Sequence, residues 1–593
     1  MSLLNFPFLQ IPFGQIVLSA FKVVPLVLTG AIGMSVMSLG SCSTTPQTRF
    51  ESSDATPEGK LFGDYLAGTY ANHVADAQAR SELFTRAFNQ DLNDASLGRR
   101  AITSAVTAGD FDLAYSLSAR VNKIAGGESM ANALLGTRAF KDSQYNNAIA
   151  ELGRETPDLT VSLMSQIMQG WAQQGAGDLA AARNTLSTLP AGSYFSKFGL
   201  LQLAELEFGA GNHEAAIKSL DELSAQDAES LEVELVQLRA RVMDSSGDKA
   251  GALTFLEEYS DENGTFETGP IPAFIATLKS GGTLEGPRSP QQNAARALTE
   301  SSFGFFVQAR AFDVAEVFLR VATELDPQYD KARMWTGEIL AFERRDDEAL
   351  AMFRSVSKDS PYWVSSKLSE SLFFSGRDRD DEALKVLENL NKEQPSFVTR
   401  SALGRAYLIK EDYENALPYY LALVTSLTEE ELKEDPNNLF LRGVAYTETK
   451  NWDAAKADFQ RVLSYDPDHS DALNYLGYTW VDRGENLTEA FDMIRRALEL
   501  EPNSGAITDS LGWAHYKLGD YEEAKGFLED AVALDPDSAT IIDHLGDVYY
   551  KLGRTREAGY QWQRALEYDP TDKERRDIQA KLTGGLSAVK AAP

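Results

Sequence analysis

Prolines divide the second half of the 593-residue chain into segments of nearly constant length. The set is Pro327, Pro361, Pro395, Pro436, Pro467, Pro502, Pro536 and Pro570. Five of the seven intervals are 34 or 35 residues long, and the other two, of 41 and 31 residues, flank Pro436. Because proline lacks an N–H and clashes with the preceding helical turn, we expect each proline to mark the end of a helix. A period of this length predicts pairs of helices stacked along the chain.

Small residues recur at fixed positions between these prolines. In residues 505–536, Gly512 lets the second helix approach the first, a turn follows at Gly519, and Ala524 and Ala531 stand where the two helices cross. The next unit repeats this arrangement with Gly546, Gly553, Ala558 and Ala565. This pattern resembles the tetratricopeptide (TPR) repeat. The sequence therefore predicts an all-α TPR superhelical solenoid of roughly 12–14 helical hairpins, degenerate in its N-terminal half.

The pattern and the composition together divide the chain into six predicted segments. Turn pairs such as Gly109-Asp110 and Gly177-Asp178 keep the repeat rhythm in the first half, where fewer signature residues are present. The predicted segments are a lipoprotein-type signal peptide (1–41), a flexible tether (42–60), a degenerate TPR-like array (61–260), a Gly/Pro-rich linker (261–293), the regular TPR array (294–570), and a capping helix with a disordered tail (571–593). For the roughly eight residues added before Pro436, we expect a longer second helix.

Cys42 is the only cysteine of the chain, and it directly follows an apolar segment, residues 23–39. Leu39-Gly40-Ser41-Cys42 resembles the cleavage box of bacterial lipoproteins, in which the cysteine becomes lipidated. The residue after the cysteine is Ser43 and not aspartate, which resembles the signal of lipoproteins that are sorted to the outer membrane. We therefore expect a lipid-anchored protein of the cell envelope, at the outer membrane and facing the periplasm. Because residues 1–21 carry no charged side chain, a translation start nearer Lys22 and an uncleaved membrane anchor stay open, as does a chance cysteine.

Charge and motif content argue against several classes of function. The chain has 88 acidic and 56 basic residues and a net charge of −32, which disfavours nucleic-acid binding. The five histidines lack the spacing of a zinc site, and the phosphate-binding loop, the nucleophile elbow and the dinucleotide fingerprint are all missing from the sequence. The repeats occupy nearly all of the mature chain. We therefore expect no enzyme, no metal, no cofactor and no small-molecule substrate.

The first helices of a TPR array line its concave face, so their exposed positions are the candidate partner-binding residues. In the last three repeats these positions are aromatic or charged: Asp471, Asn474, Tyr475, Tyr478, Asp482, Asp509, Trp513, Tyr516, Lys517, Asp543, His544, Asp547, Tyr550 and Lys551. Aromatic side chains are frequent interface anchors, and the carboxylates would favour a basic partner segment. The alternative is that some of the aromatic residues pack between neighbouring first helices.

Three related strings, LNYLGYTW at 473–480, DSLGWA at 509–514 and DHLGD at 543–547, recur in register. They resemble a family of large proteobacterial TPR envelope lipoproteins that includes LbcA-like protease adaptors. The resemblance is clear from about residue 294 to 582. It implies a scaffold that engages a periplasmic C-terminal processing protease and delivers peptidoglycan hydrolases to it, with a lipid anchor in the membrane. The alternative function is an assembly or export scaffold for outer-membrane proteins or polysaccharide.

Overall fold

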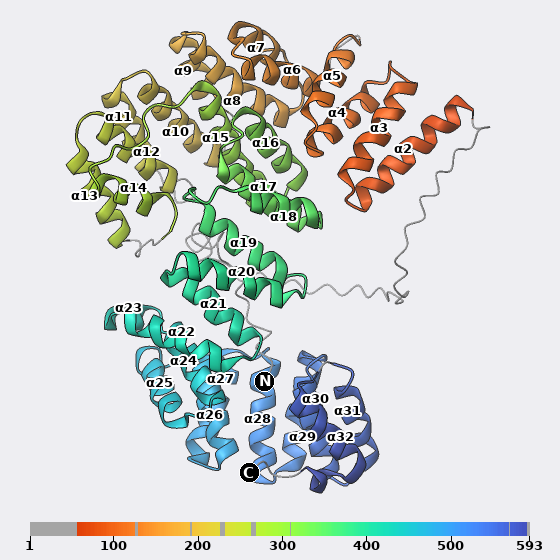
Figure 1. Ribbon diagram of the computed structural model, residues 1–593. Helices are drawn as coiled ribbons and strands as arrows, with labels where there is room; N and C mark the ends of the chain where they lie inside the picture. The colour runs from red at the N-terminus through yellow and green to blue at the C-terminus, as the bar shows by residue number, and fades with distance from the viewer. Residues whose placement is uncertain are drawn as a thin grey trace. The chain divides into compact units, whose positions relative to one another are not determined.

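The computed structural model describes residues 56–124, 128–189, 193–225, 232–262, 268–308, 310–568 and 570–589. Within these ranges the secondary structure is helical throughout, with 31 α-helices and no β-strand (Figure 1). The predicted fold class, an all-α solenoid of helical hairpins, is confirmed. The chain divides into two compact units, and the boundary between them lies at Arg377–Asp378. Cys42 lies outside the described residues, so its lipidation stays a prediction.

The N-terminal unit contains eighteen described α-helices and one π-helical turn. They are α2 (Pro57–His73), α3 (Ala77–Gln90), α4 (Ala95–Thr107), α5 (Phe111–Val121), α6 (Ser129–Lys141), α7 (Tyr145–Leu152), α8 (Leu159–Gly175), α9 (Leu179–Ser187), α10 (Ser193–Gly209), α11 (His213–Ser224), α12 (Glu232–Ser245), α13 (Lys249–Glu262), α14 (Pro270–Lys279), α15 (Pro290–Phe303), η3 (Gly304–Gln308), α16 (Phe312–Leu325), α17 (Asp330–Phe342), α18 (Asp346–Ser355) and α19 (Trp363–Ser375).

The turns of the degenerate array form as their Gly-Asp pairs predict. Gly109 and Gly177 have φ angles of 77° and 84°, a left-handed conformation that glycine adopts without steric cost. The aspartate that follows each glycine then caps the next helix: Asp110 accepts the Leu113 N–H, and Asp178 accepts the Ala181 N–H. A helical hairpin is therefore specified locally even where the larger repeat signature is weak.

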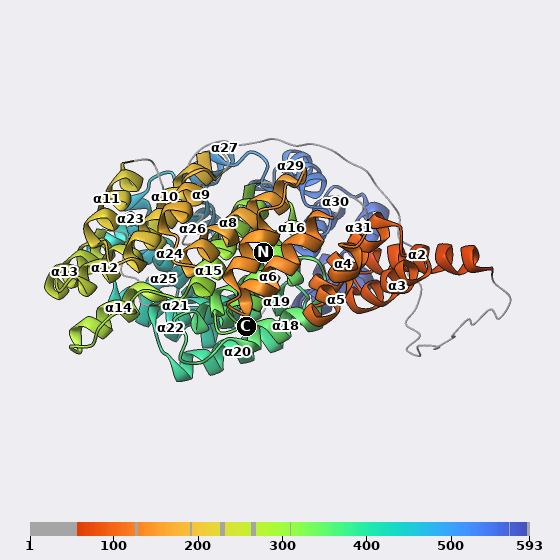
Figure 2. The same cartoon turned by 90° about the horizontal axis from the view of Figure 1, so that it is seen from above.

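Helices α15 and α16 occupy the inner face of the arc that the preceding helices form (Figures 1 and 2). Helix α15 packs against α8 and α10, and α16 packs against α4 and α6. Two hydrogen bonds between distant helices stabilise this packing. Gln291 donates to the Phe140 carbonyl at 2.9 Å, and Tyr115 donates to Glu324 at 3.1 Å. The chain itself therefore fills the inner surface that this array would otherwise offer to a partner.

The predicted linker, residues 261–293, lies within the N-terminal unit and contains helix α14. The loop after α14 binds the guanidinium group of Arg241, which is 1% exposed. Arg241 donates to the carbonyl oxygens of Glu285 at 3.0 Å and of Gly286 at 2.8 Å. A buried guanidinium needs such acceptors because its desolvation is costly. This part of the glycine-rich segment is consequently fixed to the helical array.

The C-terminal unit continues the regular repeats. Its helices are α20 (Asp380–Glu393), α21 (Phe397–Ile409), α22 (Tyr413–Ser426), α23 (Glu429–Glu434), α24 (Asn437–Glu448), α25 (Trp452–Tyr465), α26 (Ser470–Arg483), α27 (Leu487–Leu500), α28 (Gly505–Leu518), α29 (Tyr521–Leu534), α30 (Ala539–Lys551), α31 (Thr555–Ala565) and α32 (Asp572–Gly584), with a 3₁₀ turn, η4 (Leu586–Ala588), near the end.

The small residues of the pattern lie where the helices approach most closely. A Cβ atom on Gly512 would lie 2.8 Å from Leu528 Cγ, and one on Gly546 would lie 2.6 Å from Trp562 Cδ1. Ala524 and Ala531 are fully buried. Larger side chains at these positions would push the two helices of a hairpin apart.

The longer second helix expected before Pro436 is wrong. Helix α22 ends at Ser426, and the added residues form a separate short helix, α23. Thr428 starts it with a capping box, in which its hydroxyl accepts the Glu431 N–H and the Glu431 carboxylate accepts the Thr428 N–H. This reciprocal cap favours a new helix start over continuation of α22.

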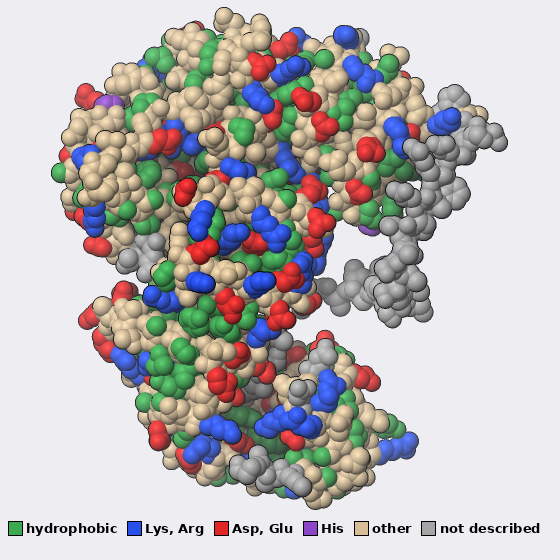
Figure 3. Space-filling view, viewed as in Figure 1, with side chains coloured by type: hydrophobic (Ala, Val, Ile, Leu, Met, Phe, Trp, Pro, Cys, Tyr) green, Lys and Arg blue, Asp and Glu red, His purple; other side chains and the backbone are tan. Residues whose placement is uncertain are grey.

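Acidic and basic side chains are interspersed on the face of the molecule that Figure 3 presents. Along the described ranges, no helix combines the length and apolar composition needed to cross a bilayer. The same residues contain no group of three or more His, Cys, Asp or Glu side chains placed to hold a metal ion.

Candidate protein-interaction site

Three first helices of the C-terminal unit carry the predicted partner-binding residues. Helix α26 packs beside α28, and α28 packs beside α30. Helix α26 carries Asn474, Tyr475, Tyr478 and Asp482, helix α28 carries Asp509, Trp513, Tyr516 and Lys517, and helix α30 carries Asp543, His544, Asp547, Tyr550 and Lys551. Spacings of three and four residues place such side chains on one face of each helix.

An aromatic stack joins α28 to α30. The ring of Trp513 lies nearly parallel to two others, with centroids 4.5 Å from Tyr516 and 4.0 Å from His544. The Lys517 ammonium lies 5.5 Å from the centroid of the same indole. Trp513 and Tyr516 are half-buried, and the Trp513 indole N–H has no hydrogen-bond acceptor among the described residues. The stack therefore places partly exposed aromatic surface on α28, while the indole nitrogen itself is buried.

His544 is held in this stack by Asp509. Its Nδ1 lies 2.8 Å from Asp509 Oδ1, and both side chains are buried. Burial alone would lower the pKa of His544, but the adjacent Asp509 carboxylate outweighs it and raises the pKa above the ordinary value. A protonated imidazole lying against Trp513 adds a cation–π contribution to the stack.

Several of the predicted acidic residues form ion pairs with lysine side chains of the following repeat or of the capping helix. Asp482 accepts from Lys517 at 2.9 Å, and Lys581 of α32 binds Asp543 at 2.6 Å and Asp547 at 2.8 Å. Sequence reasoning did not include Lys581. The repeat period could have indicated Lys581, because it lies 34 residues after Asp547, at the equivalent position of the next repeat. The acidic stripe is therefore partly neutralised within the chain.

Two carboxyl groups on this face have raised pKa values. Burial, followed by the charge of Glu501, raises the pKa of Asp471 to about 7. Burial, followed by the charge of Asp547, raises the pKa of Asp543 to about 6 even though Lys581 opposes the shift. Both groups are costly to ionise where they lie, so a cation brought by a partner would stabilise their charged forms.

Other predicted residues lie deeper in the structure or nearer its end. Tyr475 is 8% exposed and packs edge-on against Phe440 at 5.5 Å, in the core between repeats. Asn474 is 3% exposed. Tyr550 lies beside Gly585, where an added Cβ would meet its hydroxyl, and Lys551 is exposed. The role of all these residues in partner binding stays a prediction.

A second candidate surface lies on α2, at the outer end of the N-terminal arc (Figure 2). Phe62, Leu66, Tyr70 and Val74 are 61%, 49%, 66% and 50% exposed. Phe62, Leu66 and Tyr70 recur every four residues on α2, and Val74 caps its C-terminal end, so the four side chains lie toward one side of the helix. Contiguous exposed apolar surface of this kind is typical of interaction sites.

Comparison with known proteins agrees with the repeat geometry. Family models described as Tetratricopeptide repeat match residues 440–505 and 515–582. A protein of Pseudomonas aeruginosa, named "TPR repeat-containing protein PA4667", is 36% identical over 95 residues, which are 16% of this chain and 16% of that protein. The chain therefore matches only a small part of that relative's length.

Solved structures with helical repeats resemble the chain more distantly. The Cut9–Hcn1 structure of the APC/C is 14% identical, with 89% of this chain and 96% of that chain covered and a TM-score of 0.34. A tetratricopeptide repeat protein from Parabacteroides merdae is 17% identical, covering 37% of this chain and 85% of that one, with a TM-score of 0.30. Residues 440–505 and 515–582 are therefore tetratricopeptide repeats, and the described helical hairpins with their close-approach glycines form an all-α solenoid of the TPR type.

Proposed function

We propose that the chain is a non-enzymatic adaptor of the bacterial cell envelope, lipidated at Cys42 and facing the periplasm from the outer membrane. In this function it presents envelope proteins, such as peptidoglycan hydrolases, to a C-terminal processing protease. The mechanism is effective concentration, because one solenoid that holds protease and substrate converts a dilute encounter into a local one. The repeat fold, which is typically non-enzymatic, supports this function.

The observation that carries the proposal is the half-buried stack of Trp513 on the inner helices. Rigid aromatic side chains supply much contact area at a low entropic cost and are enriched among interface hot spots. The exposed apolar side chains of α2 are a second candidate surface. The raised pKa values of Asp471 and Asp543 favour a partner segment with a basic side chain.

Capture from an envelope extract tests the proposal, with immobilised residues 43–593 as bait and mass spectrometry as readout. We expect a processing protease and cell-wall hydrolases, and we expect Trp513→Ala to reduce their capture at least tenfold while the far-UV circular dichroism is unchanged. Tyr560→Ala is the matched control, because Tyr560 is an exposed aromatic of α31, outside the stack. Equal capture by Trp513→Ala would count against the stack.

The runner-up function is an assembly or export scaffold for outer-membrane proteins or polysaccharide. The same capture experiment separates the two functions. Export or assembly components in the eluate, with hydrolase turnover unchanged when the gene is deleted, would favour the runner-up. The lipid anchor is tested by Cys42→Ala, which we expect to release the protein from the membrane fraction and to abolish labelling by a radioactive fatty acid.

A further inference from the structure

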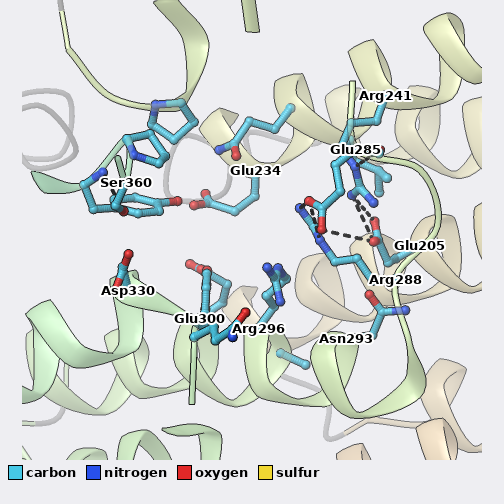
Figure 4. A pocket seen from close by; sticks show the side chains of 18 of the residues that line it. Glu205, Glu234, Arg241, Glu285, Arg288, Asn293, Arg296, Glu300, Asp330 and Ser360 are labelled. Carbon is cyan, nitrogen blue, oxygen red and sulfur yellow. Dashed lines mark hydrogen bonds and ion pairs between the residues drawn. The ribbon is translucent and has the colours of Figure 1, made fainter. Parts of the chain in front are cut away.

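A cavity of about 390 Å³ lies inside the N-terminal unit, between α10, α12, α15 and the segment before α19 (Figure 4). Its charged groups are largely paired within the chain. Arg241 pairs with Glu205 at 2.9 Å, and the Lys331 ammonium lies between Glu234 and Glu300. The outer side of α2 differs from this cavity, because its large apolar side chains are left uncovered by the described chain.

The outer side of α2 comprises Phe62, Leu66, Tyr70 and Val74, and it is free of charged side chains. Between residues 61 and 75, the exposed positions include no Asp, Glu, Lys or Arg. Terminal repeats of a solenoid usually carry a polar outer face, which keeps them soluble. An uncharged apolar side on the first described helix of the array therefore calls for a partner that covers it.

The opposite side of α2 is turned to α3, together with the one acidic residue of this stretch. Asp64 accepts from Arg86 at 2.6 Å and from Gln90 at 2.8 Å, both on α3. The Tyr65 and Phe84 rings meet on the same side, with centroids 6.0 Å apart. The packing on α3 therefore fixes which side of α2 faces outward, and it removes the carboxylate of Asp64 from that side.

The charge around α2 also differs from that of the whole chain. The net charge of the protein is −32, so most of its surface is repelled by anionic lipid. In the first turn of α2, however, the exposed Glu58 is offset by the exposed Lys60. The exposed Arg100 of α4 lies 5.4 Å from the centroid of the Tyr65 ring, and it has no ion pair among the described residues. This part of the surface lacks the acidic excess that would keep it away from a membrane.

The length of chain between Cys42 and α2 decides which partner is always near. Fifteen residues separate Cys42 from Pro57, and they span at most about 50 Å. A cysteine acylated in the bilayer therefore keeps α2 within that distance of the lipid surface. A tethered surface is present at high effective concentration, whereas a separate protein has to arrive by diffusion.

We propose that the outer side of α2 lies in the surface of the membrane, with Phe62, Leu66 and Tyr70 inserted among the lipid headgroups. Aromatic rings are enriched at this depth, and the tyrosine hydroxyl there stays in contact with water. An interfacial helix of this kind lies along the bilayer and does not cross it. The inference rests on the proposed acylation of Cys42 for the position of α2, and it gives the first array a defined orientation on the membrane.

Tryptophan quenching on vesicles tests this contact. Cys42 is the only cysteine, so residues 42–593 can be coupled through it to a maleimide lipid in vesicles of brominated phosphatidylethanolamine and phosphatidylglycerol. All seven native tryptophans lie at or beyond residue 171, so Phe62→Trp adds a reporter to a region that has none. We expect brominated lipid to quench the added emission at least twofold. Leu159→Trp, at an exposed leucine of α8, is the matched control and should not be quenched.

A charge placed on the outer side of α2 should remove the contact. We expect Leu66→Asp, added to Phe62→Trp, to reduce the quenching at least fivefold, because a carboxylate is costly to bring into the lipid surface. Leu159→Asp adds the same charge elsewhere in the unit and should leave the quenching unchanged. Both leucines are exposed, so neither change should alter the far-UV circular dichroism. Quenching of Phe62→Trp at the level of the control, or no effect of Leu66→Asp, would overturn the proposal.

This test does not depend on acylation in the cell, because chemical coupling supplies the anchor. Absence of fatty-acid labelling would count against the proposed function and leave the quenching result standing. Two other occupants of α2 give different results, each without quenching. A second copy of the chain would appear in sedimentation as a dimer that Leu66→Asp dissociates. A partner protein would be captured from envelope extract by the parent and lost with Leu66→Asp. Either result would overturn the lipid contact.

Discussion

The imidazole Nδ1 of His544 lies 2.8 Å from the Oδ1 of Asp509, a residue 35 positions earlier in the chain. The contact joins the first helices of two successive repeats at the point where Trp513 stacks on the imidazole. It thus couples the candidate binding surface to the packing of the repeats. Because both groups are buried, their charge state affects the stability of the C-terminal unit as well as its surface.

Replacing Asp509 with Asn should make the stability of this unit depend less on pH. The pKa of His544 is raised in the folded state, so its contribution is fully present below the ordinary pKa of about 6.5 and is lost as pH rises through the folded value. We expect Asp509→Asn to lower the free energy of unfolding by about 1–3 kcal/mol at pH 6 and by less at pH 9. Urea denaturation followed by circular dichroism measures both; Asp530→Asn, an exposed carboxylate of α29, is the control. The same loss at both pH values would count against a charged pair.

Lys581→Met should loosen the capping helix α32. At pH 8 the change leaves the buried carboxylates of Asp543 and Asp547 without their ammonium partner, at a cost of about 2–4 kcal/mol. Since the pKa of Asp543 is about 6 with Lys581 present, protonation at lower pH should reduce that cost. Hydrogen exchange of residues 572–584 should be faster in this variant and unchanged in Lys573→Met, whose lysine is exposed on the same helix. Unaltered protection in Lys581→Met would show that apolar contacts alone hold α32.

Alanine substitution at two glycines of one hairpin should change the stability of the C-terminal unit in opposite directions. At Gly512 an added Cβ would meet Leu528 at 2.8 Å, so Gly512→Ala should destabilise the unit by about 1–3 kcal/mol. Gly526 has no atom within 4 Å of the added Cβ and lies exposed inside α29, so Gly526→Ala should stabilise by about 0.5–1 kcal/mol. Thermal unfolding of both variants is the measurement. Stabilisation by Gly512→Ala would contradict the close helix approach.

Glu338→Gln should protect the N-terminal unit at alkaline pH. Burial raises the pKa of Glu338 to about 8, with only a hydrogen bond from Ser369 opposing the shift. A carboxyl group whose folded pKa is raised contributes stability below its unfolded pKa and loses that contribution as pH rises through the folded value. Glutamine is neutral and keeps an acceptor for Ser369, so the variant should match the parent at pH 5 and exceed it by about 1–3 kcal/mol at pH 9. Parallel stability curves from pH 5 to 9 would exclude ionisation of Glu338 in this range.

The parts of the fold that could be predicted are those set within one repeat. The turn glycines, the buried Ala524 and Ala531, and the close approach at Gly512 all follow from local pattern. The short helix α23 was not predicted. The capping box at Thr428 favours a new helix start over continuation of α22, and the spacing of the prolines does not distinguish these two outcomes. At the candidate site, the repeat pattern correctly placed the aromatic residues on first helices. It did not predict that some of the acidic residues there form ion pairs with Lys517 and Lys581.

The helical hairpins and their stacking follow from the local sequence pattern, because neighbouring repeats touch through positions a fixed number of residues apart. Three other features emerge only in the folded chain: α15 and α16 fill the first array, Arg345 donates to the Thr107 carbonyl 238 residues away, and a charged cavity forms beside Asn293. Contacts between distant repeats depend on the twist that accumulates over many hairpins. Small rotations at each step are invisible in a local pattern, yet their sum selects which distant side chains meet.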